Sequence, residues 1–272
     1  MDDASSSLVD SVLITGGSSG IGFELSKWFA KDGYRILWVA LEPDELEKSR
    51  TDLLQAYPNL DIQFLAIDLS SKDAPERIYN WTYDQVDRLT VLVNNAGIGT
   101  YGQFEKNDRA ADLRMIQINV NAVYELTHRF IPRMEADGGG RIVNISSAAS
   151  YLPLPYAGVY AATKAFVRQL SESLSWELQA RDSSVKITAV CPAAIGNTQF
   201  QKTAGMEGVR TFISPLARTT VEEVAQDAYR GIKANKDLIR TGFRFRVNYW
   251  VSRFTPRFLA RRILAWEMKR AE

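Results

Sequence analysis

The sequence predicts a single α/β domain, in which a doubly wound parallel β-sheet is covered by helices on both faces. Short apolar runs rich in Val, Ile and Leu alternate along the chain with longer amphipathic segments. Each run is apolar at successive positions, as a strand buried on both faces requires. With 272 residues, 46% of them hydrophobic, the chain can bury a full core without disulfides or metals.

Six strands are expected, in chain order, at residues 11–15, 35–40, 62–67, 89–95, 140–146 and 185–191. Helices are expected over residues 21–33, 43–57, 72–87, 106–134, 157–181 and 220–235. This order predicts right-handed crossovers, and Gly33 is the expected stop of the first helix. We find no linker or repeat, so residues 1–272 are expected to form one domain. Residues 1–10 would be a flexible N-terminus and residues 241–272 a C-terminal extension.

Composition excludes several classes of protein. Lys and Arg number 33 against 32 Asp and Glu, so a net charge of +1 gives no general attraction to nucleic acid. The single cysteine, Cys191, rules out an internal disulfide and a cysteine zinc site, and no metal is expected. The start of the chain lacks signal-peptide character, and no run of roughly 18 apolar residues is present. These features predict a cytoplasmic protein.

The segment TGGSSGIG, residues 15–22, follows the first predicted strand and opens the first helix. Backbone N–H groups at a helix N-terminus attract phosphate, helped by the helix dipole. Here Gly16 would permit a tight turn, Gly20 would let the backbone approach a pyrophosphate, and Gly22 would let the helix pack closely on the strand. A plain strand–helix turn is the alternative. The position after the first strand of an α/β chain favours dinucleotide binding.

Four further patterns follow along the chain. NNAG (94–97) ends the fourth strand, and Asn119 lies in INVN on the following helix. Tyr160 and Lys164 are four residues apart in YAATK, hence on one helix face. Ser147 ends NISS, 13 residues before Tyr160. Together with the glycine loop, these motifs resemble the short-chain dehydrogenase/reductase family in its branch of roughly 250-residue oxidoreductases, over about residues 10–200. The resemblance implies a Rossmann-type fold.

The resemblance implies an NAD(P)(H)-dependent enzyme that interconverts an alcohol and a carbonyl compound. Tyr160 would be the acid/base, and the ammonium of Lys164 would lower the phenol pKa from about 10. By resemblance, Lys164 also bonds the nicotinamide ribose, and Asn119 anchors a water in a proton relay. Ser147 would hold the substrate oxygen against Tyr160. Ser146 is the alternative to Ser147, but the 13-residue spacing favours Ser147.

The residues expected to bind the cofactor are Gly16, Ser18, Ser19, Gly20, Ile21, Gly22, Glu42, Asp68, Leu69, Asn95, Ala96, Gly97, Tyr160, Lys164, Pro192, Ala193 and Asn197. Asp68 resembles the adenine-binding aspartate of the family, with a plain strand-end aspartate as the alternative. An acid near the end of the second strand binds the ribose 2′-hydroxyl of NAD and repels the 2′-phosphate of NADP. Glu42 stands one position late, after Leu41. It favours NAD(H) over NADP(H), although it could equally be an N-terminal helix acid before Pro43.

The loop after the sixth strand departs from the family pattern. Pro192 is present, but Ala193 replaces the usual glycine. Asn197 takes the place of the usual threonine, and Thr198 stands one residue later. We therefore expect Asn197 to substitute as a polar contact, or the loop to bulge.

The expected substrate pocket is apolar. Residues 195–217 would form a flap with Phe200, Met206, Phe212, Ile213 and Leu216. The other approach would be lined by Tyr151, Leu152, Leu154 and Tyr156. Such a pocket suits an apolar or aromatic carbonyl compound or alcohol, although these residues could simply be core. Cys191 is expected to be buried, and His128 to be structural or exposed.

The C-terminal extension, residues 241–272, holds eight basic and two acidic residues, interleaved with aromatic ones. Leu259, Ile263 and Trp266 share one face of a predicted helix. This face could contact an anionic membrane surface peripherally, or pack on the protein and cover a subunit contact or the substrate mouth. Relatives in the family are commonly homodimers or homotetramers.

Two other functions compete with the enzyme. A non-catalytic NAD(H)-binding regulator could use the same fold. The four aligned catalytic groups argue against it. A sugar-nucleotide epimerase or dehydratase also uses Tyr and Lys on one helix, but the glycine spacing G-x-x-x-G-x-G disfavours it.

Overall fold

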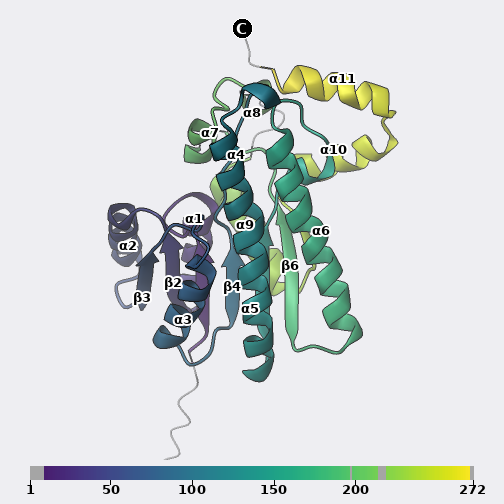
Figure 1. Ribbon diagram of the computed structural model, residues 1–272. Coiled ribbons are helices and arrows are strands. Elements are labelled where there is room, and N and C mark those ends of the chain that lie inside the picture. Colours follow the sequence, from purple (N-terminus) through teal and green to yellow (C-terminus); the bar gives the residue numbers. More distant parts are fainter. Residues whose placement is uncertain (1–8, 197, 214–218, 270–272) are drawn as a thin grey trace, which may run out of the picture.

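The computed structural model describes residues 9–196, 198–213 and 219–269. Among these residues, seven parallel strands form one sheet in the order β3-β2-β1-β4-β5-β6-β7 (Figure 1). The strands are β1 (Ser11–Thr15), β2 (Arg35–Ala40), β3 (Ile62–Ala66), β4 (Val91–Asn94), β5 (Gly140–Ile145), β6 (Val185–Cys191) and β7 (Leu238–Arg240). The predicted doubly wound parallel sheet is confirmed.

Helices connect the strands. They are α1 (Gly20–Lys31), α2 (Pro43–Ala56), α3 (Ala74–Gln85), α4 (Arg109–Ile116), α5 (Val123–Ala136), α6 (Gly158–Ala180), α7 (Gln199–Thr203), α8 (Arg210–Ile213), α9 (Val221–Lys233), α10 (Phe243–Phe254) and α11 (Arg257–Glu267). Three short elements complete the set: the 3₁₀ turns η1 (Phe104–Lys106) and η3 (Ala148–Tyr151), and the π-helical turn η2 (Gln117–Ala122).

Two expectations about these elements are corrected. The helix expected over residues 106–134 begins at Arg109, because Asp108 caps α4 by accepting from the Ala110 N–H. It then continues from α4 into α5 through the π-helical segment η2. A seventh strand, β7, extends the sheet beyond the six that were expected. Of the N-terminal segment 1–10, residues 1–8 lie outside the described part of the chain.

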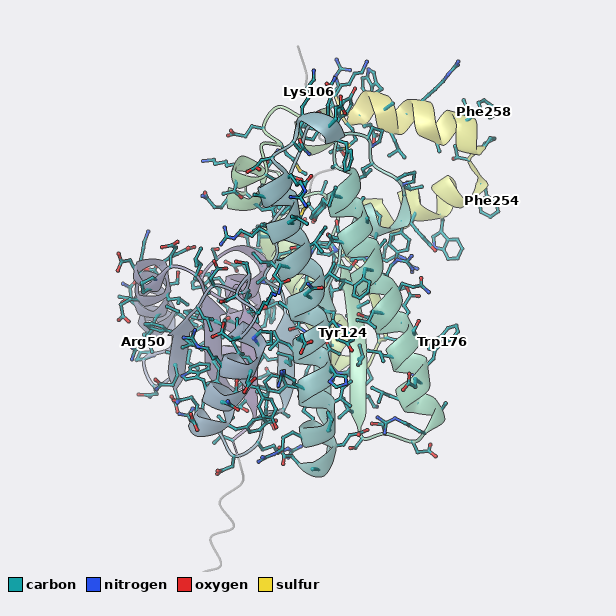
Figure 2. All side chains as sticks on the ribbon, in the orientation of Figure 1. Arg50, Lys106, Tyr124, Trp176, Phe254 and Phe258 are labelled. Atoms are coloured by element: carbon teal, nitrogen blue, oxygen red, sulfur yellow. The ribbon has the colours of Figure 1, made fainter. Side chains whose placement is uncertain are left out.

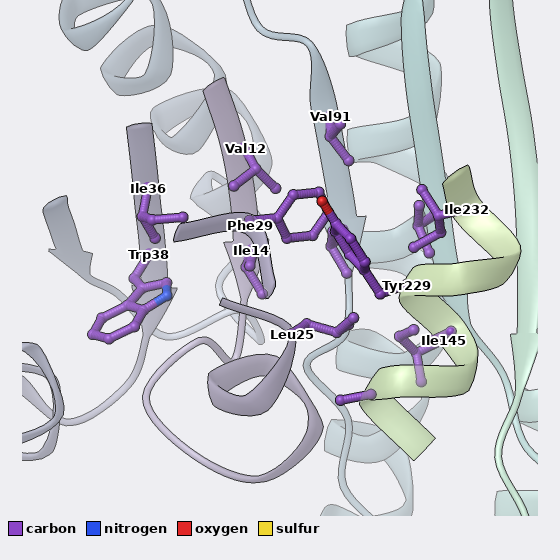
Figure 3. Packing of buried hydrophobic residues seen from close by; sticks show 14 of the residues in the cluster. Val12, Ile14, Leu25, Phe29, Ile36, Trp38, Val91, Ile145, Tyr229 and Ile232 are labelled. Atoms are coloured by element: carbon purple, nitrogen blue, oxygen red, sulfur yellow. The ribbon is translucent and has the colours of Figure 1, made fainter. Parts of the chain in front are cut away.

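Successive side chains of each strand point to opposite faces of the sheet, and a layer of helices covers each face. Val12 and Ile14 face the helices α1, α2 and α9, while Leu13 between them faces α3, α5 and α6. Figure 3 shows the first of these clusters, where Phe29 of α1 and Tyr229 of α9 meet over the sheet. Both strand faces are therefore buried, which accounts for the continuous apolar runs in the sequence.

The outer faces of the helical layers meet solvent. Tyr124 of α5 and Trp176 of α6 point away from the sheet (Figure 2). The last two helices, α10 and α11, project from the body of the molecule beyond the start of α6 (Figure 1). Phe254 and Phe258 stand at the turn between them (Figure 2). Within the described residues, no helix combines the length and the apolar character needed to cross a bilayer.

The sheet order creates a crevice. The chain passes from β1 outward to β2 and β3, and then returns to β4 on the other side of β1. Loops leaving the carboxyl ends of β1 and β4 therefore run in opposite directions and leave a gap between them. Open α/β sheets bind their ligands at such a point.

Candidate active site

A cavity of about 730 Å³ opens at the carboxyl edge of the sheet. Its floor is formed by residues that directly follow β1, β4, β5 and β6, among them Gly16, Asn95, Ser146 and Pro192. One end of the cavity is lined by the glycine loop. The other end is lined by apolar side chains of η3, α7, α10 and α11.

The glycine loop has the geometry predicted for it. Gly16 has φ +65°, which permits the tight turn, and its N–H donates to the carbonyl of Val39 on β2 at 2.6 Å. A Cβ on Gly22 would lie 2.3 Å from the Gly16 carbonyl oxygen, so only glycine allows this packing. Gly20 has φ +55°, and a Cβ there would meet nothing within 4 Å, because this side of the loop is open.

The N-terminus of α1 points into the cavity. Ser19, Gly20 and Ile21 line it, and the Ser19 side chain makes no capping hydrogen bond. The N–H groups of a first helical turn have no partners within the helix, and the helix dipole makes this end positive. This end of the cavity therefore suits an anionic group.

Asn95 holds the loops after β1 and β4 together. Its Nδ2 donates to the carbonyl oxygens of Thr15 at 2.9 Å and Gly16 at 3.0 Å. The Thr15 hydroxyl accepts in turn from the N–H groups of Asn95 and Ala96, both at 3.0 Å. The side-chain amide of Asn95 therefore connects two loops of the protein. Asn95 and Ala96 nevertheless line the cavity.

Tyr160 and Lys164 lie one turn apart on α6 and both line the cavity. Burial raises the pKa of the Tyr160 phenol, and its hydrogen bond with the Ser147 hydroxyl lowers it by less. The Lys164 ammonium donates to the Ile145 carbonyl at 2.9 Å, and burial lowers its pKa to about 8. The sequence predicted that Lys164 would lower the phenol pKa. In this structure burial governs both groups, and the phenol pKa is raised.

The two serines at the end of β5 differ in their partners. Ser146 donates its hydroxyl to the Lys164 backbone carbonyl at 2.7 Å, which ties β5 to α6. Ser147 accepts from the Ala149 N–H at 3.1 Å and lies against the Tyr160 phenol. The structure thus places Ser147, as predicted, at the phenol.

Asn119 is fully buried in η2 and lies behind the cavity wall rather than in it. Its Oδ1 accepts from the Ile98 N–H at 3.0 Å, and its Nδ2 donates to the Ile98 carbonyl at 2.9 Å and to Thr163 Oγ1 at 3.1 Å. Gly97 separates it from Lys164. A Cβ on Gly97 would lie 3.0 Å from Lys164 Nζ and 3.2 Å from Asn119 Oδ1, so the two groups meet at this glycine.

Several residues predicted to bind the cofactor do not line the cavity; they are Ser18, Gly22, Glu42, Asp68 and Leu69. Ser18 is buried and its carbonyl accepts from the Ser49 hydroxyl. Glu42 is exposed at the N-cap of α2 and makes no side-chain capping bond. Leu69 is buried in the core.

Asp68 is held by hydrogen bonds. Its Oδ1 accepts from the Ser70 N–H and hydroxyl, both at 2.8 Å, and its Oδ2 accepts from Arg114 at 3.0 Å. Burial alone would raise the pKa of Asp68, but these bonds outweigh it and the pKa is lowered. The structure thus supports a structural role for Asp68 after β3, where it binds Ser70 and Arg114. A contact with adenine stays a prediction.

The loop after β6 is only partly described. Pro192 and Ala193 line the cavity as predicted, and Thr198 caps α7 by accepting from the Gln201 N–H at 3.2 Å. Asn197 lies outside the described residues. Cys191 is buried and His128 is exposed, as expected.

The apolar end of the cavity agrees in part with the predicted pocket. The predicted residues that line it are Tyr151, Leu152, Leu154, Phe200 and Met206. Tyr156 instead reaches solvent, with φ +64°. The side chains of Phe212 and Ile213, and all of Leu216, lie outside the described part.

The C-terminal extension supplies a further wall of the cavity, in agreement with the expectation that it could cover the substrate mouth. This wall consists of Phe245, Tyr249, Thr255, Ala260, Ile263, Leu264, Glu267 and Met268. An aromatic cluster fixes this wall to the sheet. The Tyr151 and Tyr249 rings meet edge to face at 4.8 Å, and the Arg240 guanidinium lies 4.1 Å from the Tyr249 ring centroid. The interleaved aromatic residues of the extension were the available signal.

Comparisons with known proteins agree with this architecture. A family model described as short chain dehydrogenase matches residues 10–207. Sulfoacetaldehyde reductase of Chromohalobacter salexigens is 30% identical over 230 residues, covering 84% of this chain and 83% of the relative.

Two solved structures are similar over nearly the whole chain. A short-chain dehydrogenase from Sphingobium yanoikuyae in complex with NADPH has a TM-score of 0.78 and 27% identity, covering 97% of this chain and 98% of the other. The bulky-bulky ketone specific alcohol dehydrogenase from Comamonas testosteroni has a TM-score of 0.76 and 26% identity, covering 98% and 97%. Because the family model spans strands β1 to β6 and the cavity floor, the chain belongs to the short-chain dehydrogenase/reductase family of oxidoreductases.

Proposed function

We propose that the protein interconverts a ketone or aldehyde and the corresponding alcohol with NAD(H) or NADP(H), and that its substrate is apolar or aromatic. The observation that carries this proposal is the position of Tyr160, Ser147 and Lys164 in the cavity whose one end is lined by glycines and whose other end is apolar. The likeness to a dehydrogenase in complex with NADPH and to a ketone-specific alcohol dehydrogenase supports both parts of it.

Tyr160 is the proposed acid/base. Because burial raises its pKa, the phenol is protonated at neutral pH and can donate a proton to the oxygen of a carbonyl that is being reduced. Ser147, which lies at the phenol, would hydrogen-bond the same oxygen and fix its position. Lys164 and Asn119, which meet at Gly97, would complete the path for the proton.

The residues at the glycine-lined end fit a dinucleotide. Gly20 leaves the space in front of the α1 N-terminus free, so a pyrophosphate could approach the N–H groups there. Ala96, Gly97 and Pro192 would lie along the remainder of the group. When bound, the nicotinamide supplies or accepts the hydride, which no side chain of this cavity can do.

A comparison of Tyr160→Phe with Tyr156→Phe tests the proposed reaction. Tyr160→Phe removes the proton donor, so we expect turnover of an aryl alkyl ketone to fall by roughly 10²–10⁴-fold while nucleotide binding is kept. Tyr156 is exposed and lies outside the cavity, so Tyr156→Phe should retain turnover. The rate is followed by loss of reduced nucleotide absorbance. Unchanged turnover in Tyr160→Phe would contradict the assignment.

The proposed preference is for NAD(H). Glu42 follows the end of β2, where its carboxylate would repel a 2′-phosphate. We expect NADH to bind more tightly than NADPH in parallel fluorescence titrations. Glu42→Gln should reduce the difference, because it removes the charge and keeps the side-chain shape. Tighter binding of NADPH by the unaltered protein would refute this preference.

We also propose that the C-terminal extension makes peripheral contact with an anionic membrane surface. Seven large apolar side chains of α10 and α11 are exposed: Val247, Trp250, Phe254, Phe258, Leu259, Ile263 and Trp266. We call them the tail surface. With eight basic and two acidic residues over 241–272, the tail surface suits anionic lipid. A second copy of the same surface would be repelled by its like charge. For the remaining exposed apolar residues on α5 and α6, we propose contacts within a homo-oligomer.

A further inference from the structure

The cavity contains one carboxylate that the proposed reaction does not use. Among the described residues that line the cavity, only Lys164 and Glu267 have side chains that are ionised in water at neutral pH. The Lys164 ammonium is bound to the Ile145 carbonyl. Glu267, the last residue of α11, accepts no hydrogen bond and forms no ion pair within the part of the chain that the structure describes.

The surroundings of Glu267 are apolar. Leu264 and Met268 line the cavity on the same helix end, and Met268 is only 3% exposed. Among the influences that come from the described residues, burial alone acts on the pKa of Glu267, and it raises that pKa. Glu267 is partly buried, so its carboxylate loses part of its hydration, which a donor entering the cavity would replace.

The end of α11 is fixed in place. The Tyr101 hydroxyl donates to the Met268 carbonyl, and the Arg210 N–H donates to the Lys269 carbonyl at 3.1 Å. The Arg210 guanidinium lies 4.8 Å from the Trp266 ring centroid, so it forms a cation–π contact with this ring and not an ion pair with the Glu267 carboxylate. These contacts lie on both sides of Glu267 in the sequence, so its backbone is anchored beside the cavity.

We infer that Glu267 selects substrates that carry a cationic hydrogen-bond donor, such as a primary ammonium group, remote from the reacting carbonyl. This inference rests on the proposed function and names its substrate class more closely. The apolar body of the substrate would fill the space lined by Tyr151, Phe200 and Met206. The ammonium group would donate to the Glu267 carboxylate in a charge-assisted bond, and a substrate with a remote carboxylate would be repelled.

The experiment uses two ketones that differ at one group. Both are phenylalkyl ketones of the same skeleton, one with a para-methyl and the other with a para-aminomethyl substituent. Binding of each to the nucleotide-loaded protein is measured by calorimetry, and turnover by loss of reduced nucleotide. A hydrogen bond to a charged group predicts a preference for the aminomethyl ketone of roughly 10-fold or more in Kd and in kcat/KM.

Glu267→Gln should abolish this preference, because it keeps the shape and removes the charge. The matched control is Glu207→Gln, which alters an exposed carboxylate of the loop between α7 and α8 outside the cavity and should keep the preference. Equal binding of the two ketones by the unaltered protein, or a preference that survives Glu267→Gln, would overturn the inference. Selective binding without turnover would uphold it and reject the proposed reaction, so the two failures can be told apart.

Discussion

Burial sets the protonation of Tyr160 and Lys164 more than their proximity does. The sequence spacing put both side chains on one face of α6, and they lie there. However, the ammonium is bound to the Ile145 carbonyl, and the pKa of each group is shifted towards the value that favours its neutral form. Both groups therefore cost folding free energy whenever they carry charge, as desolvated groups at functional sites do.

Lys164→Met should stabilise the fold at neutral pH while abolishing turnover. The lysine pKa falls from 10.5 to about 8 on folding, so below pH 8 both states are protonated and the folded protein carries the full burial penalty. The penalty disappears as pH rises towards 10.5. After subtracting the lost bond to Ile145, we expect a gain of about 2 kcal/mol at pH 7 that shrinks above pH 8.

Thermal unfolding at several pH values measures this gain. Lys186→Met is the control, because Lys186 is exposed on β6 and should show no such dependence on pH. A Lys164→Met protein that is less stable than the unaltered protein at pH 7 would contradict the prediction.

In the glycine loop between β1 and α1, one glycine allows close backbone packing and another leaves open space in front of the helix N-terminus. At Gly22 a Cβ would meet the Gly16 carbonyl oxygen, whereas at Gly20 it would enter open space in front of the helix N-terminus. The sequence predicted the close packing at Gly22 and the open space at Gly20, because each follows from backbone geometry within one strand–turn–helix unit. Pyrophosphate binding at Gly20 stays a prediction. No contact between distant segments was needed.

Substitution of the two glycines should give different results. Gly22→Ala should destabilise the fold by about 1–3 kcal/mol, because backbone must shift to make room. Gly20→Ala should cost only about 1 kcal/mol for its positive φ, but weaken nucleotide binding at least roughly tenfold, because its Cβ occupies the approach to the helix.

Gly33→Ala is the matched control for Gly20→Ala. Gly33 has φ +79° with nothing within 4 Å of a Cβ, so it carries similar strain away from the cavity. Denaturant unfolding measures the stability of the three variants, and titration with NADH measures their nucleotide affinity. Equal loss of nucleotide affinity in Gly33→Ala and Gly20→Ala would show that strain, rather than access, is responsible.

Elements that depend on distant contacts were predicted less well. β7 is only three residues long, and its Ile239 packs with α9 residues in the cluster on one face of the sheet. The wall from α10 and α11 is held by Arg240 of β7 and by Tyr151, which lies about 100 residues before it in the sequence. Local periodicity cannot indicate such pairings. By contrast, Ser147, Tyr160 and Lys164 were predicted from the short motifs NISS and YAATK and from the resemblance of these motifs to the family, which requires no knowledge of distant contacts.

At the scale of the whole molecule, the tail surface lies at the same end as the cavity, since α10 and α11 both line the cavity and carry the exposed residues. Phe254 and Phe258 lie at its tip (Figure 2) and are 83% and 64% exposed. A membrane bound there would meet the wall of the cavity, so an apolar substrate could pass between the two without crossing open water.

The protein should sediment with vesicles that contain phosphatidylserine and much less with pure phosphatidylcholine. Replacing Phe254 and Phe258 with Ser should weaken this binding, because it removes the most exposed aromatic groups of the tail surface. Trp176→Ser, at an exposed position on α6, should leave binding to these vesicles unchanged. If the double variant loses self-association rather than vesicle binding, the tail surface is an interface between copies of the chain.

The π-helical turn η2 makes the site sensitive to chain length as well as to residue identity. A π turn spans one residue more than an α turn, and each residue of an α-helix advances the direction by about 100°. Deleting one residue from η2 would restore a regular helix and turn Asn119 relative to α5, away from Ile98 and Thr163. Such a frame-preserving deletion would leave Asn119, Ser147, Tyr160 and Lys164 all encoded, yet turnover would be lost.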